Sequence, residues 1–442
     1  MIIDPISDID VYMALLESRK AKLKYILETH FHADFVSGHF ALAKETKALV
    51  VFGPNSITKL DIYRAQDKEY LPLGTINIEV LHSPGHTLES TCYLLRDSEG
   101  NQHSIFTGDT LFINEVGRPD LACDEKLKSA DLATMLYNSI KYHIDPLPDN
   151  VIIFPGHGAG SPCGKSIGKG DTSTVGEQRK TNFALNPDLS LEEFITLATF
   201  DLPKPLRYMS YDVMVNKGEI ETSNYGDILG RKLSFLEFKS ILERDPEILI
   251  IDSRQNIDDF IVKSALFIGF NSNLSIFLGS LVNPKQKLLL ISDDEEVTKE
   301  CIKRFLRIGY DNIVGYLAGG IKEWINNNGE ISKIDKIEPQ NLKPIYDEKK
   351  ESIVIVDVRN KHEYEDASLL GSIHVPLIDL ERKIISKELE LIMDKEILIH
   401  CRGGPRGFIG QSIFLKNGFG NIKSIIGGMM KMIESGFDFK KN

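Results

Sequence analysis

The sequence predicts an α/β protein with several domains, and three observations support this fold class. The chain has 442 residues, enough for two to four domains that each bury a core. Up to about residue 230, short apolar runs alternate with polar loops and helically spaced segments. The rest of the chain contains an internal repeat whose copies each have the order strand, helix, strand, helix, which is typical of a parallel sheet.

Composition excludes several classes of protein. A hydrophobic fraction of 42% and a charged fraction of 26% are ordinary for a globular chain. The formal net charge of −12 argues against a nucleic-acid partner. No apolar run reaches the roughly 18 residues of a membrane span, and the acidic start lacks the basic region of a secretory signal. The 5 cysteines are scattered and have no C-x-x-C spacing, so we expect reduced thiols in a cytoplasmic protein.

The first 230 residues supply the strand and helix signals. Short apolar runs, several of them ending just before a polar loop, predict strands, and two segments with helical spacing predict helices. The strand runs are KYIL at 24–27, INIEVL at 76–81, CYLL at 92–95, SIFTG at 104–108 and VIIFPG at 151–156, and the helical segments are HFALAKET at 39–46 and LATMLYNSIKY at 132–142.

Four segments of this block carry residues that bind metals in proteins. ETHFHADFVSGH at 28–39 contains an H-x-H-x-D run, and SPGHT, TGDTLF and FPGHGAG each add one more side chain. Each segment follows an apolar strand and contains glycine or lies beside it, so several strand ends could bring the side chains to one rim. The candidate ligands are His30, His32, Asp34, His86, Asp109 and His157. Four such segments in this order predict a metal site.

The segments ETHFHADFVSGH, SPGHTLES, TGDTLF, GRPDL and GHGAGSPCGK resemble the motifs of the metallo-β-lactamase superfamily, most closely those of its persulfide dioxygenase branch. The resemblance implies a four-layer αββα sandwich with metal at one sheet edge. It also implies one Fe(II) per chain, held by His30, His86 and Asp109, with zinc as a substitute acquired during purification. The family carries further strands before the IIDP segment, so either the true start lies upstream or the first sheet lacks an edge.

The donor types support iron independently of the resemblance. Two imidazoles and one carboxylate form the facial triad of non-haem Fe(II) oxygenases, which leaves positions open for O2 and a substrate sulfur. A hydrolytic pair of metals about 3.5–4 Å apart would need a second ligand set. In that set a histidine normally follows the aspartate of the run, and this chain has Phe35 there. We therefore expect one metal and redox chemistry, with His32, Asp34 and His157 orienting the ligands through hydrogen bonds.

Two further residues of this block are candidates for the site. In the family, the region of Arg118, in VGRPDL, helps to hold the carboxylate of the thiol carrier, and a guanidinium can clasp a carboxylate bidentately. A surface salt bridge is the alternative. Cys163, in GSPCGK, follows His157 closely, so its thiol could carry sulfur or be oxidised. A passive buried cysteine is the alternative.

The repeat in the second half of the chain is visible in two pairs of segments. IDSR at 251–254 returns as VDVR at 356–359, and GYDNIVGYLAGG at 309–320 returns as GFGNIKSIIGG at 418–428, a spacing of about 105–110 residues, the size of a small domain. Polar, glycine-containing stretches separate the blocks. The predicted domains are residues 1–230, 231–330 and 338–442.

The last block delivers a cysteine from a strand end. In EILIHCRGGPRG, Cys401 stands between an apolar strand and a helical run, where backbone N–H groups and a positive helix end surround it. Arg402 and Arg406 add two positive charges that favour the thiolate. Gly403 and Gly404 allow the tight turn that points backbone amides inward. The loop should therefore bind anionic sulfur species such as sulfite or thiosulfate.

The last block resembles a rhodanese domain through VDVRNKHEYE, GSIHVPL, CRGGPR and IIGG, over roughly residues 340–440. The resemblance implies that Cys401 carries sulfur as a persulfide, and we expect Asp357 and Arg359 to form an internal ion pair. In the middle block, aligning LLLISDDEE with ILIHCRGG places Asp293 where Cys401 stands. The middle repeat then has no nucleophile and an acidic loop, so we expect it to be inactive.

The whole pattern resembles a bacterial persulfide dioxygenase–rhodanese fusion. That resemblance implies Fe(II)-dependent oxidation of a low-molecular-weight thiol persulfide to sulfite by O2, coupled to sulfur transfer that gives thiosulfate. Two alternatives stay open, a thioester hydrolase of the glyoxalase II type with two metals and a non-enzymatic sulfur carrier. Family members commonly associate, so we expect a homo-oligomer. The identity of the thiol carrier does not follow from the sequence.

Overall fold

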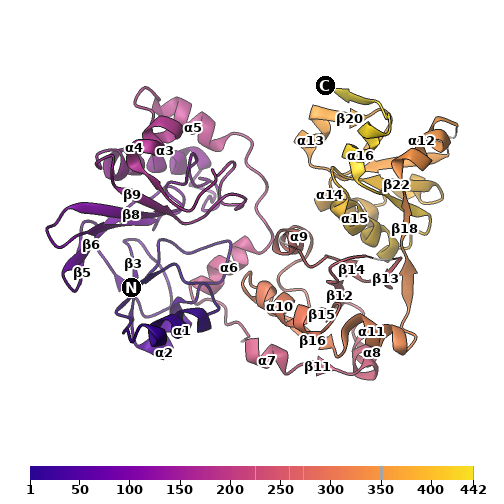
Figure 1. The fold of residues 1–442 in the computed structure, drawn as a ribbon, viewed down its shortest axis with the longest axis horizontal. Coiled ribbons are helices and arrows are strands. Elements are labelled where there is room, and N and C mark those ends of the chain that lie inside the picture. Colours follow the sequence, from indigo (N-terminus) through magenta and orange to yellow (C-terminus); the bar gives the residue numbers. More distant parts are fainter. Residues whose placement is uncertain (224, 258, 272, 349–351, 442) are drawn as a thin grey trace. The chain divides into compact units, whose positions relative to one another are not determined.

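The computed structural model describes residues 1–223, 225–257, 259–271, 273–348 and 352–441 (Figure 1). The chain forms two compact units. One comprises Met1–Thr222 with Leu306–Gly309, and the other comprises Ser223–Phe305 with Tyr310–Asn442. Among the described residues, no helix is long and apolar enough to cross a membrane.

The first unit contains two sheets. Its strands are β1 (Ile2–Ile3), β2 (Tyr25–Leu27), β3 (Leu49–Phe52), β4 (Tyr63–Arg64), β5 (Tyr70–Leu73), β6 (Ile76–His82), β7 (Thr91–Arg96), β8 (Gln102–Gly108), β9 (Ile152–Pro155) and β10 (Ser173–Thr174). The smaller sheet is parallel and has the order β1-β2-β3-β4. The larger sheet has the order β10-β9-β8-β7-β6-β5, and its β8–β9 pair is parallel while the others are antiparallel. The predicted strand runs coincide with β2, β6, β7, β8 and β9, except that the run at 24–27 begins one residue before β2 and the run at 151–156 extends one residue beyond each end of β9.

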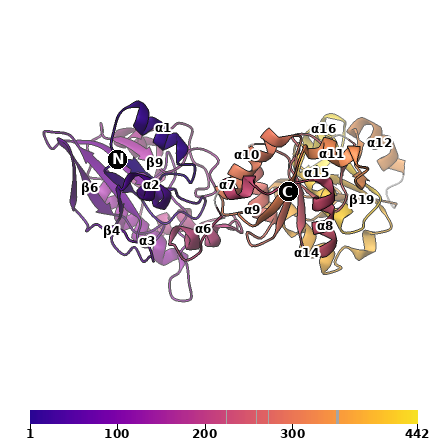
Figure 2. The same cartoon turned by 90° about the horizontal axis from the view of Figure 1, so that it is seen from below.

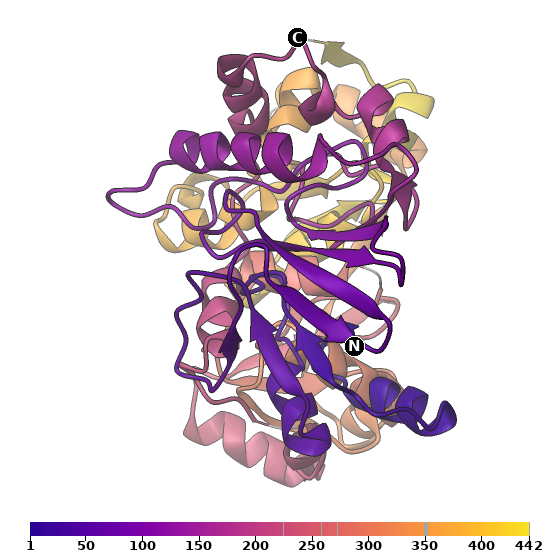
Figure 3. The same ribbon diagram turned by 90° about the vertical axis from the view of Figure 1, so that its left-hand side faces the viewer.

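Helices cover both outer faces of these sheets. They are α1 (Asp10–Ser18), α2 (His39–Thr46), α3 (Ser129–Ser139), α4 (Val175–Thr181), α5 (Leu191–Thr199) and α6 (Met209–Asn216), and the π-helical segment η1 (Ile140–Ile144) continues α3. The ribbons show α1 and α2 on one outer side, and α3 on the other (Figures 1, 2 and 3). Both predicted helical segments lie in this set, HFALAKET as α2 and LATMLYNSIKY across α3 and η1.

Alternating side chains of the strands fill the spaces between these layers. Tyr25 and Leu27 of β2 pack with Tyr93 of the larger sheet, so they lie between the two sheets. Ile26 points to the opposite face of the same strand and packs with Leu42 of α2. On the far side, the larger sheet packs against α3 and α5 through a separate apolar cluster. The order helix, sheet, sheet, helix confirms the predicted αββα sandwich.

The second unit contains two copies of one parallel sheet. The first copy consists of β11 (Lys232–Leu233), β12 (Leu249–Asp252), β14 (Leu266–Phe267), β15 (Leu288–Ile291) and β16 (Ile313–Leu317), with helices α7 (Tyr225–Leu229), α8 (Phe235–Arg244), α9 (Leu274–Leu281), α10 (Glu295–Leu306) and α11 (Gly320–Asn326). The second copy consists of β18 (Asp335–Ile337), β19 (Ile353–Asp357), β21 (Ile373–His374), β22 (Glu396–His400) and β23 (Ile422–Ile425), with helices α12 (Pro339–Glu348), α13 (Lys361–Asp366), α14 (Leu377–Ile385), α15 (Pro405–Lys416) and α16 (Gly428–Glu434).

The two copies have equivalent strand orders, which confirms the repeat read from the sequence. The orders are β11-β16-β15-β12-β14 and β18-β23-β22-β19-β21. Each copy adds a short antiparallel pair, β13 (Phe260–Val262) with β17 (Ile331–Lys333) and β20 (Ala367–Leu369) with β24 (Phe439–Lys441). The expected pair of Asp357 and Arg359 is present and buried, with 2.6 Å between Oδ2 and an arginine nitrogen.

The register of the repeat corrects one sequence alignment. Asp252 pairs with Ile291 in the first copy, as Asp357 pairs with His400 in the second. The residue after each strand is therefore equivalent, which places Ser292 where Cys401 stands; the alignment that put Asp293 there is wrong by one residue. The middle repeat thus presents a hydroxyl at this position, followed by an acidic loop.

Candidate functional site

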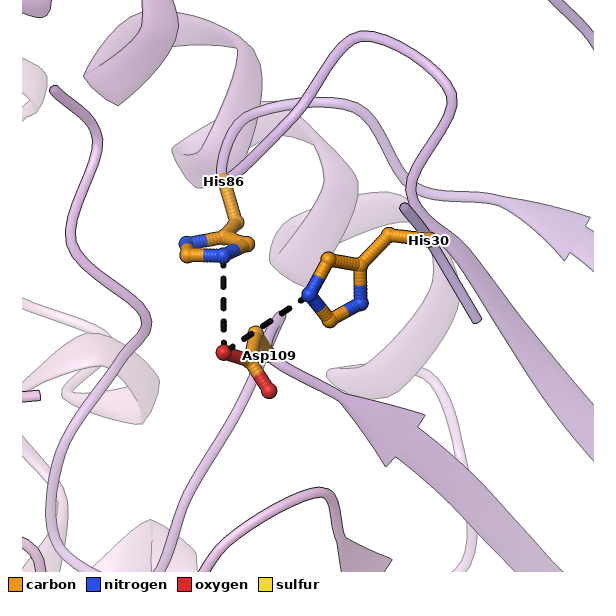
Figure 4. Close-up of side chains that lie close together, drawn as sticks. All are labelled: His30, His86 and Asp109. Atoms are coloured by element: carbon orange, nitrogen blue, oxygen red, sulfur yellow. Dashed lines mark ion pairs between the residues drawn. The ribbon is translucent and has the colours of Figure 1, made fainter. Parts of the chain in front are cut away.

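The predicted metal ligands come from four loops at strand ends. His30 follows β2, and His86 lies between β6 and β7. Asp109 comes directly after β8, and His157 comes two residues after β9. His30 and His86 point at Asp109 from two different loops (Figure 4). The fold therefore brings together residues that are up to about 130 positions apart in the sequence.

The first ligand group consists of His30, His86 and Asp109. Their ligand atoms lie within 4.8 Å of one another, and all three side chains are buried. Asp109 Oδ2 lies 3.4 Å from His86 Nε2 and 3.9 Å from His30 Nε2. Within the residues that the structure describes, His30 Nε2 and both Asp109 carboxylate oxygens have no hydrogen-bond partner. Buried polar atoms without partners are costly, so His30 Nε2 and Asp109 Oδ2, which face each other in this group, fit a bound cation.

Neighbouring groups orient the two histidines of this group. His86 Nδ1 lies 2.9 Å from the carbonyl oxygen of Arg118, which can only accept, so Nδ1 carries the proton and Nε2 offers a lone pair. His30 Nδ1 lies 3.0 Å from Thr29 Oγ1, which in turn donates to Asp4. Burial, together with neighbouring histidines, holds the pKa of His30 well below its usual value. A neutral imidazole with a free Nε2 is the form that binds a metal.

The second ligand group consists of His32, Asp34 and His157, whose ligand atoms also lie within 4.8 Å of one another. His157 Nε2 lies 3.2 Å from Asp34 Oδ2 and 3.4 Å from Asp109 Oδ1. Asp109 therefore presents Oδ2 to the first group and Oδ1 to the second. The Phe35 ring packs on the His32 ring with 4.2 Å between centroids, so it is an apolar neighbour of this group.

The far nitrogen of His32 faces two carboxylates. His32 Nε2 lies 3.1 Å from Asp4 Oδ1 and 3.4 Å from Glu28 Oε2. Although burial opposes it, these carboxylates raise the pKa of His32 well above its usual value. His39 Nδ1 lies 3.1 Å from the other Glu28 oxygen. Sequence reasoning missed Asp4, Glu28 and His39; Glu28 and His39 lie beside the H-x-H-x-D run, whereas Asp4 lies near the start of the chain and had no such signal.

Cys163 lies beside the metal centre, as its position in the sequence suggested. Its Sγ is within 4.8 Å of ligand atoms of Asp109 and His157. The side chain is buried and packs with Phe112 and Ile167. Burial, followed by the charges of Asp34 and Asp109, raises the pKa of the thiol well above its usual value. Its redox role stays a prediction.

The guanidinium of Arg118 is already engaged. It pairs with both oxygens of Asp120, at 2.7 Å and 2.8 Å, and donates to the carbonyls of Pro162 and Pro203. Arg118 is 2% exposed. Its predicted role in binding a substrate carboxylate stays a prediction, and it would require displacement of Asp120. The Arg118 backbone instead connects two parts of the site. Its carbonyl oxygen accepts from His86 Nδ1, and its N–H donates to the carbonyl of Cys163.

The sulfur-transfer loop lies in the second unit, between β22 and α15. Cys401 is 1% exposed, and the Gly404 N–H donates to its sulfur at 3.1 Å. Gly404 has a φ of 114°, a conformation that glycine adopts without strain. Arg402 and Gly403 are exposed at the rim of the loop. The cysteine therefore lies at the carboxyl edge of a parallel sheet and at a helix start, as predicted.

Arg406 is fixed across this loop by a glutamate. Its two terminal nitrogens donate to Glu363 at 2.6 Å and 2.8 Å, a bidentate pair. Glu363 also accepts from the Asn360 N–H as part of a capping box at the start of α13. Burial alone would raise the pKa of Glu363, but the hydrogen bonds and charge of Arg406 lower it to about 2. Sequence reasoning missed Glu363, although VDVRNKHEYE contains it.

The pair of Glu363 and Arg406 predicts a pH dependence of stability. The pKa of Glu363 falls from 4.5 to about 2 on folding, so the stabilisation is fully present above pH 4.5 and is lost as pH falls towards 2. After allowance for its partial exposure we expect about 2 kcal/mol at pH 7. Thermal unfolding of the wild type and Glu363→Gln at several pH values measures this. The difference in unfolding free energy between the two proteins should shrink as pH falls below 4.5. A difference that stays constant with pH would show that the Arg406 pair does not lower the pKa of Glu363.

Known protein families match the first unit and the last repeat separately. A family model for the metallo-beta-lactamase superfamily matches residues 1–157, and one for a rhodanese-like domain matches residues 339–435. A crystal structure of a metallo-beta-lactamase from Staphylococcus aureus subsp. aureus COL superposes with a TM-score of 0.62 at 28% identity, over 72% of this chain and 91% of that chain. The fold and the sites thus define a metallo-β-lactamase-type protein that carries a rhodanese-like domain.

Relatives narrow this class further. The chain is 32% identical over 212 residues to the mitochondrial persulfide dioxygenase ETHE1 of Bos taurus. The matched region makes up 46% of this chain and 73% of the relative. It is 33% identical over 160 residues to a probable hydroxyacylglutathione hydrolase of Schizosaccharomyces pombe. This match makes up 35% of this chain and 57% of the relative. The chain therefore spans little more than half the length of such hydrolases. It belongs to the family of the ETHE1 persulfide dioxygenases, within the metallo-β-lactamase superfamily.

Proposed function

We propose that the first unit oxidises a low-molecular-weight thiol persulfide with O2 and that the last repeat transfers sulfur to the product. The observation that carries the proposal is the composition of the first ligand group, in which two buried imidazoles and one buried carboxylate lie close together. This donor set is that of the non-haem Fe(II) oxygenases. A bound Fe(II) would supply activation of O2 beside the substrate sulfur, with one ion per chain.

The proposed oxidation balances with water as a co-reactant. A persulfide RSSH, O2 and H2O give RSH, sulfite and two protons, so the outer sulfur is oxidised and O2 is reduced. The chain's own residues hold the reacting centre: His30, His86 and Asp109 present their lone pairs, and the Phe35 ring makes one neighbouring surface apolar. Buried side chains exclude bulk water from this point.

The proposed sulfur transfer uses Cys401. Its thiolate attacks the outer sulfur of a second persulfide, and the S–S bond breaks as the thiol RSH leaves. Sulfite then attacks the sulfur on Cys401, which forms the S–S bond of thiosulfate and releases the cysteine. The Gly404 N–H donates to the Cys401 sulfur, and the Arg406 guanidinium, held by Glu363, supplies a positive charge that would attract the anionic acceptor. The net reaction converts RSSH and sulfite into RSH and thiosulfate.

A second candidate is a dinuclear hydrolase that acts on acyl-glutathione thioesters. The second ligand group favours it, because His32, Asp34 and His157 lie within 4.8 Å of one another and Asp109 offers one oxygen to each group. The similarity to hydroxyacylglutathione hydrolases also supports it. Against it stands Phe35, where the superfamily run has a further histidine.

Supplying the metal-loaded protein with each substrate, with and without O2, separates the two functions. Thioester hydrolysis needs no O2, whereas persulfide oxidation stops without it. We expect product from the persulfide in the presence of O2 only, and no thioester turnover above background. Thioester hydrolysis that is equally fast under anaerobic conditions would replace the first proposal with the second.

Replacing Phe35 by histidine tests the role of this position directly. We expect the metal content to rise from about one ion per chain towards two, because an imidazole would complete the second ligand group. Metal analysis after dialysis against excess Zn²⁺ measures this. Phe35→Leu is the matched control, since it removes the ring without adding a ligand. Two ions per chain in the wild type would show that Phe35 does not limit the second site.

A further inference from the structure

A single side chain from a distant helix crosses the loop that carries three candidate ligands. The loop between β2 and α2 holds His30, His32 and Asp34 outside regular helix or strand. Asn216, the last residue of α6, donates from Nδ2 to the carbonyls of His32 and Phe35, each at 2.8 Å. Its Oδ1 accepts from the Ser37 N–H, also at 2.8 Å. Both amide hydrogens and the amide oxygen are therefore used on one loop.

These bonds are buried, so their loss would be costly. Asn216 is 2% exposed, and removing its amide would leave three backbone groups of the loop without this partner. Other residues hold the earlier part of the loop: Asp4 accepts from the Thr29 N–H, and Glu89 accepts from the Phe31 N–H. Asn216 bonds to the later part, where the backbone sets the direction of the His32 and Asp34 side chains and of the Phe35 ring.

We propose that Asn216 is a positioning residue of the metal centre, and that α6 belongs to this centre although it lies beyond residues 1–157, which match the superfamily model. The inference rests on the proposed metal site and extends it by a residue about 180 positions away in the sequence. Asn216 holds the part of the loop that carries Asp34, and Asp34 Oδ2 lies 3.2 Å from His157 Nε2, which lies 3.4 Å from Oδ1 of the proposed ligand Asp109. The loss of groups that orient metal ligands costs 10–100-fold in metal affinity. We expect a loss of that size for Asn216→Ala.

The experiment compares metal affinity with stability in the full-length chain. Zn²⁺ affinity is measured by competition with a chromophoric chelator, and Tm is measured with and without the metal. Asn216→Ala should weaken binding roughly 10–100-fold and reduce the rise in Tm that Zn²⁺ produces. Asn216→Asp keeps an acceptor for the Ser37 N–H but lacks both donors as a carboxylate, so it should also bind more weakly.

A matched control separates positioning from general destabilisation. Phe194→Leu, a buried core residue of α5, should lower Tm with and without Zn²⁺ and leave the affinity unchanged. Wild-type affinity in both Asn216 variants would overturn the proposal, and if Asn216→Ala does not fold, Asn216→Asp decides. His86→Ala tests the metal centre itself: wild-type Zn²⁺ binding in that variant would contradict the proposed site and not only the role of Asn216.

Discussion

Replacing Asp109 by alanine is expected to abolish metal binding and oxygen uptake together. Asp109 presents one oxygen to each ligand group, at 3.4 Å from His86 Nε2 and 3.4 Å from His157 Nε2. Its loss removes the only carboxylate of the first group. Since losing a residue that merely orients a ligand costs 10–100-fold, losing a ligand should lower activity by at least about a hundredfold. Metal analysis and an oxygen electrode measure the two effects.

A carboxylate outside the site provides the control for Asp109. Glu79, in β6, pairs with Arg96 at 2.6 Å, and it is not a member of either ligand group. Glu79→Gln should keep the wild-type metal content and oxygen uptake. If Asp109→Ala retained its metal and its oxygen uptake, the first ligand group would not be the reacting centre.

Replacing Cys401 by serine is expected to end sulfur transfer while oxygen uptake continues. Serine has nearly the size of cysteine, so the loop between β22 and α15 should fold, but a hydroxyl cannot carry sulfane sulfur. We expect sulfur transfer to fall by at least about three orders of magnitude, as for other lost nucleophiles. Sulfite should then accumulate where the wild type forms thiosulfate, and quantifying both anions measures the change.

An exposed thiol provides the control for Cys401. Cys123 is exposed and lies in the first unit. Cys123→Ser should give the wild-type ratio of thiosulfate to sulfite. Unchanged thiosulfate formation by Cys401→Ser would remove the case for sulfur transfer at this loop.

Local signals in the sequence predicted the strands and the candidate metal-binding side chains, whereas the αββα sandwich and the ligand set of His30, His86 and Asp109 came from the resemblance to the metallo-β-lactamase superfamily. Strand runs that end at polar loops placed His30, His86 and Asp109 at strand ends, and the structure brings them to one point. The strand-to-helix passage predicted the surroundings of Cys401 in the same way. These features depend on periodicity and on the direction of short strands, which neighbouring residues largely determine.

Long-range contacts could not be predicted in this way. Asn216 bonds to the loop after β2 although it lies about 180 residues later in the sequence, and nothing beside it in the sequence indicates that partner. The bidentate contact of Arg118 with Asp120 is short-range, only two residues apart, but it depends on the conformations of both side chains, which the sequence does not specify. The position of Ser292 needed strand register, because an alignment of two short apolar runs can slip by one residue.

Oxygen consumption tests the central claim most directly. The protein is purified without air, loaded with Fe(II) and given a low-molecular-weight persulfide, and O2, sulfite, thiosulfate and bound metal are quantified. The proposed function predicts one ion per chain, one O2 consumed for each sulfur oxidised, and thiosulfate as the final product. No oxygen uptake, together with two ions per chain and hydrolysis of an acyl-glutathione thioester, would contradict it and identify the first unit as a hydrolase.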